Sequence, residues 1–135
     1  MARTTGDFTQ GQLTSITQSE LAYEIDGGGS AISTGVKGSF SVPFACRIDK
    51  VTLLADQTGS AVVDIWKDTY SNYKPTALDS ITASSKPTLS SAIKYQDSTL
   101  TSWIRTVAAN DVITFNVDSA ATVTRLTISL TVTRL

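Results

Sequence analysis

The sequence contains no histidine and only one cysteine, Cys46. Without histidine, the chain lacks the commonest general base, the commonest side-chain metal ligand and the usual partner of a nucleophilic Ser or Cys. A single thiol cannot form an internal disulfide and leaves a cysteine-based zinc site short of ligands. The glycine run 27–29 is not followed by the Lys-Ser/Thr pair of a phosphate-binding loop. We therefore expect no catalytic residue, no metal site and no cofactor, and so no enzyme.

Charged side chains are also scarce, at 17% of residues with a net charge of −1, and the eleven Lys and Arg are spread singly along the chain. A nucleic-acid partner needs clustered cations that displace counterions from phosphates. No apolar run approaches the roughly 20 residues of a membrane-spanning helix. The N-terminal residues lack the apolar core of a secretion signal. We expect no nucleic-acid or membrane partner, and synthesis in a cytoplasm.

Threonine and serine are abundant instead, with 21 and 17 copies. Threonine is β-branched and favours strands, whereas serine favours turns and exposed strand faces. A chain of 135 residues is long enough for one domain with one core. The composition indicates an all-β protein with strands joined by loops.

Apolar residues alternate with polar ones most clearly at 125–133, where a strand with one buried face is expected. Residues 56–59, Asp-Gln-Thr-Gly, are typical of a hairpin turn. Residues 68–91 read as the longest irregular stretch, interrupted only at 78–82. The remaining segments that we expect to be strands are 21–25, 36–42, 44–55, 61–67, 98–106 and 113–117. About eight antiparallel strands predict a jelly-roll-like β-sandwich over residues 21–135, with an immunoglobulin-like sandwich as the alternative.

Residues 1–20 form a polar N-terminal arm in this interpretation. The segment has too few apolar side chains to bury a core by itself, so we expect it to order against a partner, although a terminus without a partner fits the composition equally well. The side chains predicted to make contacts with a capsid or another partner are Arg3, Phe8, Leu13 and Ile16.

Trp66, Tyr70 and Tyr73 fall within eight residues, beside Asp64 and Asp68. Aromatic faces stack on sugar rings, but the same side chains also form core edges and subunit interfaces. The sequence leaves open a glycan platform, which Trp103 would extend, and a packing or interface role. Asp64 and Asp68 would lie about 13 Å apart along a strand, which is too far for a glycosidase pair. A pair with Glu24 or Asp97 from another strand stays open beside the commoner role of surface or turn carboxylates.

The order of several short motifs resembles a small module that recurs in structural proteins of tailed bacteriophages. Its members include head decoration (cement) proteins, tail fibres and baseplate appendages. The resemblance covers about residues 36–134. The motifs that carry it are Val42–Cys46, Leu53–Ser60, Val63–Tyr70, Lys86–Ala92, Leu100–Trp103, Phe115–Ser119 and Val123–Arg125.

This resemblance implies a virion component that is made in the cytoplasm of a bacterial host. One compact β domain behind a short polar arm is the layout of a capsid decoration protein, located on the head surface. The resemblance further implies a homotrimer that binds the major capsid protein or another virion protein and stabilises the shell. The alternative is a receptor- or glycan-binding module of a tail fibre or baseplate appendage.

Overall fold

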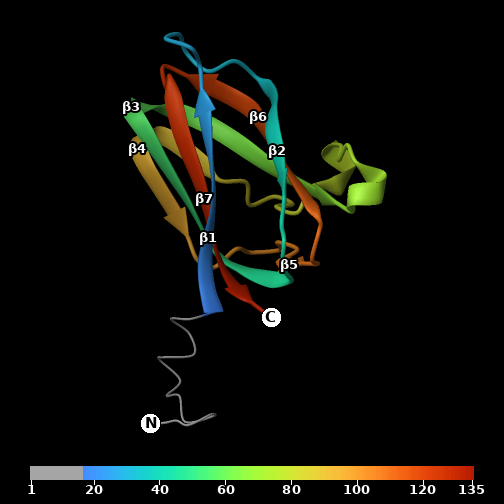
Figure 1. Cartoon of the computed structure of the whole chain (residues 1–135). Helices are drawn as coiled ribbons and strands as arrows, with labels where there is room; N and C mark the ends of the chain where they lie inside the picture. Colours follow the sequence, from blue (N-terminus) through green and yellow to red (C-terminus); the bar gives the residue numbers. More distant parts are fainter. Residues whose placement is uncertain (1–16) are drawn as a thin grey trace.

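The computed structural model describes residues 17–135 and contains a single antiparallel sheet of seven strands that curls into a half barrel (Figure 1). Two 3-10 helices, η1 (Tyr70–Asn72) and η2 (Ala77–Asp79), lie between the third and fourth strands. The strands are β1 (Gln18–Asp26), β2 (Gly35–Ser41), β3 (Cys46–Asp68), β4 (Thr88–Asp97), β5 (Thr106–Val107), β6 (Val112–Ala121) and β7 (Arg125–Arg134).

The C-terminal strand is the one that the alternation predicts. In β7 the apolar side chains from Leu126 to Val132 are buried at every second position, and the Thr and Ser between them are half-buried on the other face. β1 pairs with β7 along its whole length, from Gln18 opposite Thr133 to Asp26 opposite Arg125. Residues 18–20, which the sequence assigned to the arm, are therefore part of the sheet.

β3 is 23 residues long and extends through both halves of the sheet. Its first part pairs with β7, and its second part, from Ser60 to Asp68, pairs with β6. The hairpin predicted at residues 56–59 is therefore wrong, because the chain passes straight through this segment. The connection between β6 and β7 lies opposite and supplies the reason: the Asp56 carboxylate accepts the backbone N–H groups of Thr124 (3.1 Å) and Arg125 (2.9 Å).

The strand order is β1-β7-β3-β6-β2, and β4 and β5 both pair with β3. The all-β, antiparallel class predicted from the sequence is confirmed, with seven strands where about eight were expected. All seven belong to one continuous hydrogen-bonded sheet, so the two halves of the molecule are joined through β3. Their inner faces enclose one apolar core, whose largest fully buried side chains are Phe115, Ile48, Leu53, Ile65, Ile81, Leu89 and Ile113.

The region between β3 and β6 differs most from the prediction. β4 occupies residues 88–97, partly within the stretch expected to be irregular, and pairs with β3 across a register shift. The strand expected at 98–106 is wrong: the Asp97 carboxylate accepts the backbone N–H of Thr99 and turns the chain. Leu100 and Trp103 nevertheless lie in the core. They are apolar residues of a buried loop, and this is why their sequence resembles that of a strand.

Tyr23 of β1 joins the two halves across the mouth of the half barrel. Its ring stacks on Phe115 of β6 at 5.4 Å, and its hydroxyl donates a 2.8 Å hydrogen bond to the carbonyl oxygen of Lys37 in β2. This approach requires Gly38, because a Cβ there would lie 1.9 Å from the Tyr23 hydroxyl oxygen. Gly38 therefore provides the space that Tyr23 occupies.

Replacing Gly38 by alanine should displace the Tyr23 ring and lower the free energy of unfolding by about 1–3 kcal/mol, as overpacking does. Urea denaturation measures the change. In a Tyr23→Ala background the same substitution should cost much less, because the clash is gone. An equal cost in both backgrounds would contradict this account of Gly38.

Cys46 begins β3 and is fully buried. Burial raises the pKa of the Cys46 thiol, and the nearby carboxylates of Asp49 and Asp111 add to the shift. The thiolate is therefore disfavoured, as expected of an unreactive cysteine. No helix within residues 17–135 has the length and apolar content needed to cross a membrane.

Candidate functional site

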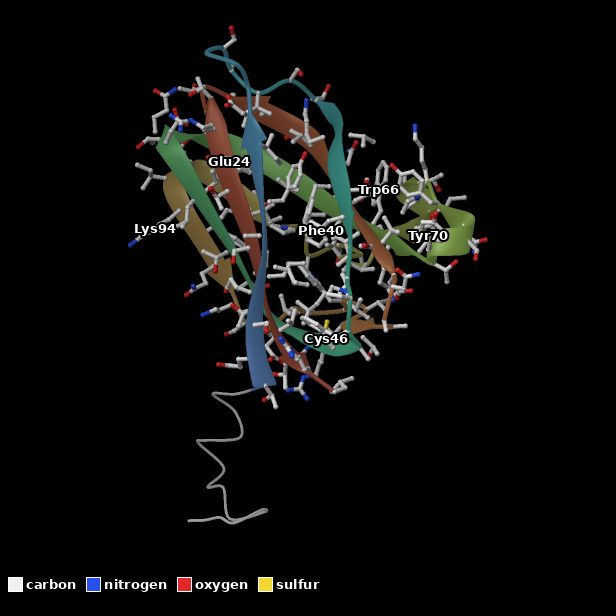
Figure 2. All side chains as sticks on the ribbon, viewed as in Figure 1. Glu24, Phe40, Cys46, Trp66, Tyr70 and Lys94 are labelled. Atoms are coloured by element: carbon white, nitrogen blue, oxygen red, sulfur yellow. The ribbon has the colours of Figure 1, made fainter. Side chains whose placement is uncertain are left out.

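A cleft of about 400 Å³ opens where β2, the start of β6 and the η1 segment meet. It combines aromatic rings with hydroxyl and amide groups, and none of its lining side chains is charged. The lining residues are Ser39, Phe40, Ser41, Tyr70, Tyr73, Asn110 and Val112. Figure 2 shows Phe40 on β2, an edge strand of the sheet, and Tyr70 on the segment that projects beyond it.

The sheet supplies the floor of the cleft. Ser39 and Ser41 are two residues apart on β2, so their side chains point to the same face. They pair with Thr114 and Val112 of β6, and the hydroxyl groups of Ser39 and Thr114 lie 2.7 Å apart. The regular alternation of the strands thus places the hydroxyls of Ser39 and Ser41 on the same face as the Val112 side chain.

The turn before β6 supplies Asn110. Its backbone N–H donates to the carbonyl oxygen of Val42 (2.6 Å), and its φ of 73° lies in the left-handed region, which asparagine tolerates better than most residues. This contact with the end of β2 holds the Asn110 side chain at the rim of the cleft.

Tyr70 and Tyr73 form the opposite wall, at the two ends of η1. The helix buries none of its residues and is held by local hydrogen bonds instead. The Thr69 hydroxyl accepts the Asn72 backbone N–H, and the Asp68 carboxylate accepts hydrogen bonds from Thr69 and Asn72. The two tyrosines remain 68% and 54% exposed, so the segment presents both rings to solvent.

The two tryptophans of the predicted aromatic platform lie elsewhere. Trp66 is 9% exposed and its indole N–H donates to Asp64 (2.9 Å), whereas Trp103 is 8% exposed and donates to the carbonyl oxygen of Ser85 (2.8 Å). Neither lines the cleft. The structure brings together Tyr70 and Tyr73, and it gives Trp66 and Trp103 packing positions.

Asp64 connects the projecting segment to the sheet. This buried carboxylate accepts hydrogen bonds from Trp66, from the hydroxyls of Ser80 (2.7 Å) and Thr82 (2.8 Å), and from the backbone N–H of Ile65 (2.8 Å). The Lys86 ammonium lies 3.7 Å away. Ser80 and Thr82 follow η2, so one side chain fixes both the strand before the projecting segment and the chain after it. With its oxygens already engaged, Asp64 is a structural group.

Burial raises the pKa of Asp64, but the hydrogen bonds from Ser80, Trp66 and Thr82 outweigh it, and the net pKa lies below the ordinary value of 3.8. A carboxyl group with a lowered folded-state pKa stabilises the fold above its unfolded pKa. That contribution is lost as the pH falls through the folded-state pKa.

Replacing Asp64 by asparagine should therefore lower the free energy of unfolding at pH 7 by about 3 kcal/mol, because buried donors lose a charged acceptor. Urea denaturation at several pH values measures it. The difference from the unmodified protein should shrink as the pH falls from 3.8 through the lower folded-state pKa, because the carboxylate is protonated first in the unfolded chain and then in the folded protein. Glu24→Gln, on the exposed face of β1, is the control and should change stability by less than about 0.5 kcal/mol. A pH-independent difference would contradict this role.

Sequence reasoning missed the β2 and β6 side of the cleft. Ser39, Phe40 and Ser41 are about thirty residues from Tyr70, and Asn110 is about forty further on, so no local pattern connects them. The predicted contact residues Arg3, Phe8, Leu13 and Ile16 lie outside the described residues. Within residues 17–135, no group of three or more His, Cys, Asp or Glu side chains is placed to hold a metal ion.

No protein-family model matches the chain, and no curated protein matches it.

Proposed function

We propose that this protein is a bacteriophage virion structural protein that acts by binding, and specifically a capsid decoration (cement) protein that stabilises the head shell. The resemblance of residues 36–134 to the phage module supports the virion assignment. The observation that carries the decoration role is the entry of the chain into the sheet. Among residues 17–135, β1 pairs with β7 alone, so the polar segment before Gln18 is joined to an edge strand of the described sheet.

The outer face of the sheet near β1 also suits an extended polar partner. Exposed acidic side chains, Glu20 and Glu24, lie on β1, and Lys94 is exposed on β4 at the other edge. Thr and Ser residues of β7 lie between them. A face with separated charges and many hydroxyls favours electrostatic selection of one docking orientation. It is consistent with a homotrimer on a shell of the major capsid protein.

We interpret the half barrel as an open form of the jelly-roll-like sandwich, and prefer it to an immunoglobulin-like sandwich. The unbroken course of β3 through both halves supports this interpretation, since a single strand then contributes to two packed layers.

Labelling virions with an antibody against this protein, followed by electron microscopy, tests the decoration role. The expected result is label over the whole head surface. Deleting residues 2–16 should abolish binding to mature capsids while the described domain still folds, as its circular dichroism would show. Label confined to the tail, or full capsid binding by the shortened protein, would contradict the proposal.

The second candidate is a receptor- or glycan-binding module of a tail fibre or baseplate appendage. The exposure of Tyr70 and Tyr73 in one cleft favours it. In this role, virions carrying Tyr70→Ala and Tyr73→Ala should adsorb to host cells more slowly, measured as the decline of free phage. Virions carrying Leu78→Ala are the control, because Leu78 is 97% exposed on η2 but does not line the cleft. Unchanged adsorption by the double variant would exclude this candidate.

A further inference from the structure

We propose that the cleft between β2 and the η1 segment binds a short, neutral saccharide. The Tyr70 and Tyr73 rings would stack on the C–H faces of the sugar, and Ser39, Ser41 and Asn110 would bond its hydroxyl groups. The inference rests on the binding role proposed above and adds the chemical class of the ligand. It does not depend on whether the protein lies on the head or the tail.

The aromatic wall is the first argument. η1 buries no residue, so the fold does not need the two tyrosines for its core. Both rings are nevertheless more than half exposed. Rigid aromatic rings give large contact area at a low cost in side-chain entropy, which suits them to recognition.

The unused polar groups are the second argument. Within residues 17–135 the Ser41 hydroxyl and the Asn110 side-chain amide have no hydrogen-bond partner in the protein. The Ser39 hydroxyl bonds Thr114 but retains further capacity, since a hydroxyl has one donor and two acceptor positions. Hydroxyls and an amide both donate and accept, as sugar hydroxyls require.

The absence of charge among the lining side chains is the third argument. Asp111 follows Asn110, but its carboxylate accepts the backbone N–H of Ala108 (2.9 Å) and lies 3.6 Å from the Lys67 ammonium. An anionic ligand would therefore find no cation on the lining, and a cationic ligand no free carboxylate. The volume falls within the range of about 300–1,000 Å³ that is common for small-ligand sites.

A tyrosine-lined groove also resembles sites for proline-rich peptides. The cleft favours a sugar because its polar groups come from β2 and the turn before β6 and lie on the wall opposite the tyrosine rings. The prolines of such a peptide offer only carbonyl acceptors, and these leave the acceptor positions of Ser39, Ser41 and Asn110 without donors.

The test uses the purified full-length protein and a panel of neutral oligosaccharides built from glucose, galactose, mannose and N-acetylglucosamine. Saturation-transfer NMR identifies a binder, and titration gives its affinity. Tyr70→Ala and Tyr73→Ala should each weaken binding by about tenfold or more. Tyr70→Phe keeps the ring and should stay within about twofold of the unmodified protein.

Two further variants separate the site from the fold. Asn110→Gly removes the amide and suits the left-handed backbone at this position, so it should weaken binding without loss of stability. Leu78→Ala on the neighbouring η2 should leave the affinity unchanged. Thermal unfolding of every variant verifies that the protein is folded.

The proposal is overturned if no saccharide in the panel binds, or if Tyr70→Ala leaves the affinity unchanged. Binding of a proline-rich peptide that is weakened by the same substitutions, with no saccharide binding, would replace the proposed ligand class. Antibody labelling of virions is a separate measurement, so a failed saccharide site and a wrong location on the virion are distinguishable.

Discussion

The backbone pairing of β3 with four other strands is the interaction on which the fold depends. β4, β5, β6 and β7 all hydrogen-bond to this one strand, and β1 and β2 attach to it through β7 and β6. β3 stays one strand through Asp56 and Gly59, where a hairpin would have divided it: its ladder with β7 ends at Ala55 and its ladder with β6 begins at Ser60. A Cβ at Gly59 would lie 2.6 Å from the carbonyl oxygen of Ala121, so the backbones of β3 and the end of β6 come too close here for a side chain.

The cleft depends on the same strand through its far end. β3 ends at Asp68, immediately before η1, and Asp64 binds the chain that returns after η2. The projecting segment is thus closed at its base by a buried carboxylate and capped along its length by Thr69 and Thr76. Tyr70 and Tyr73 hold their positions without contributing to the core, which separates the proposed binding surface from the energetics of folding.

The sequence predicts the class of the fold and its clearest strand, because burial on one face leaves a period-two pattern such as that of residues 126–132. It does not predict the course of β3, since Asp56 and Gly59 are typical of turns, and the Thr124 and Arg125 N–H groups that Asp56 binds lie more than sixty residues away. It also predicts a strand at 98–106 where the structure has a loop, because an apolar loop residue that enters the core, such as Trp103, looks the same in sequence as a strand residue. Local patterns also cannot predict the β2 side of the cleft. β2 is placed near η1 because it pairs with β6, β6 pairs with β3, and η1 follows the end of β3.

The projecting segment between Asp68 and Ser80 has an evolutionary consequence. Because η1 and η2 bury none of their residues, substitutions on their outer surface leave the core unchanged as long as the caps at Thr69, Thr76 and Asp79 remain. The segment therefore tolerates diversification in the way that an antibody loop does on its framework. Related chains would then be expected to share the β3 ladder and the Asp64 anchor while differing at the positions of Tyr70, Tyr73 and Leu78, so that one scaffold serves many surfaces.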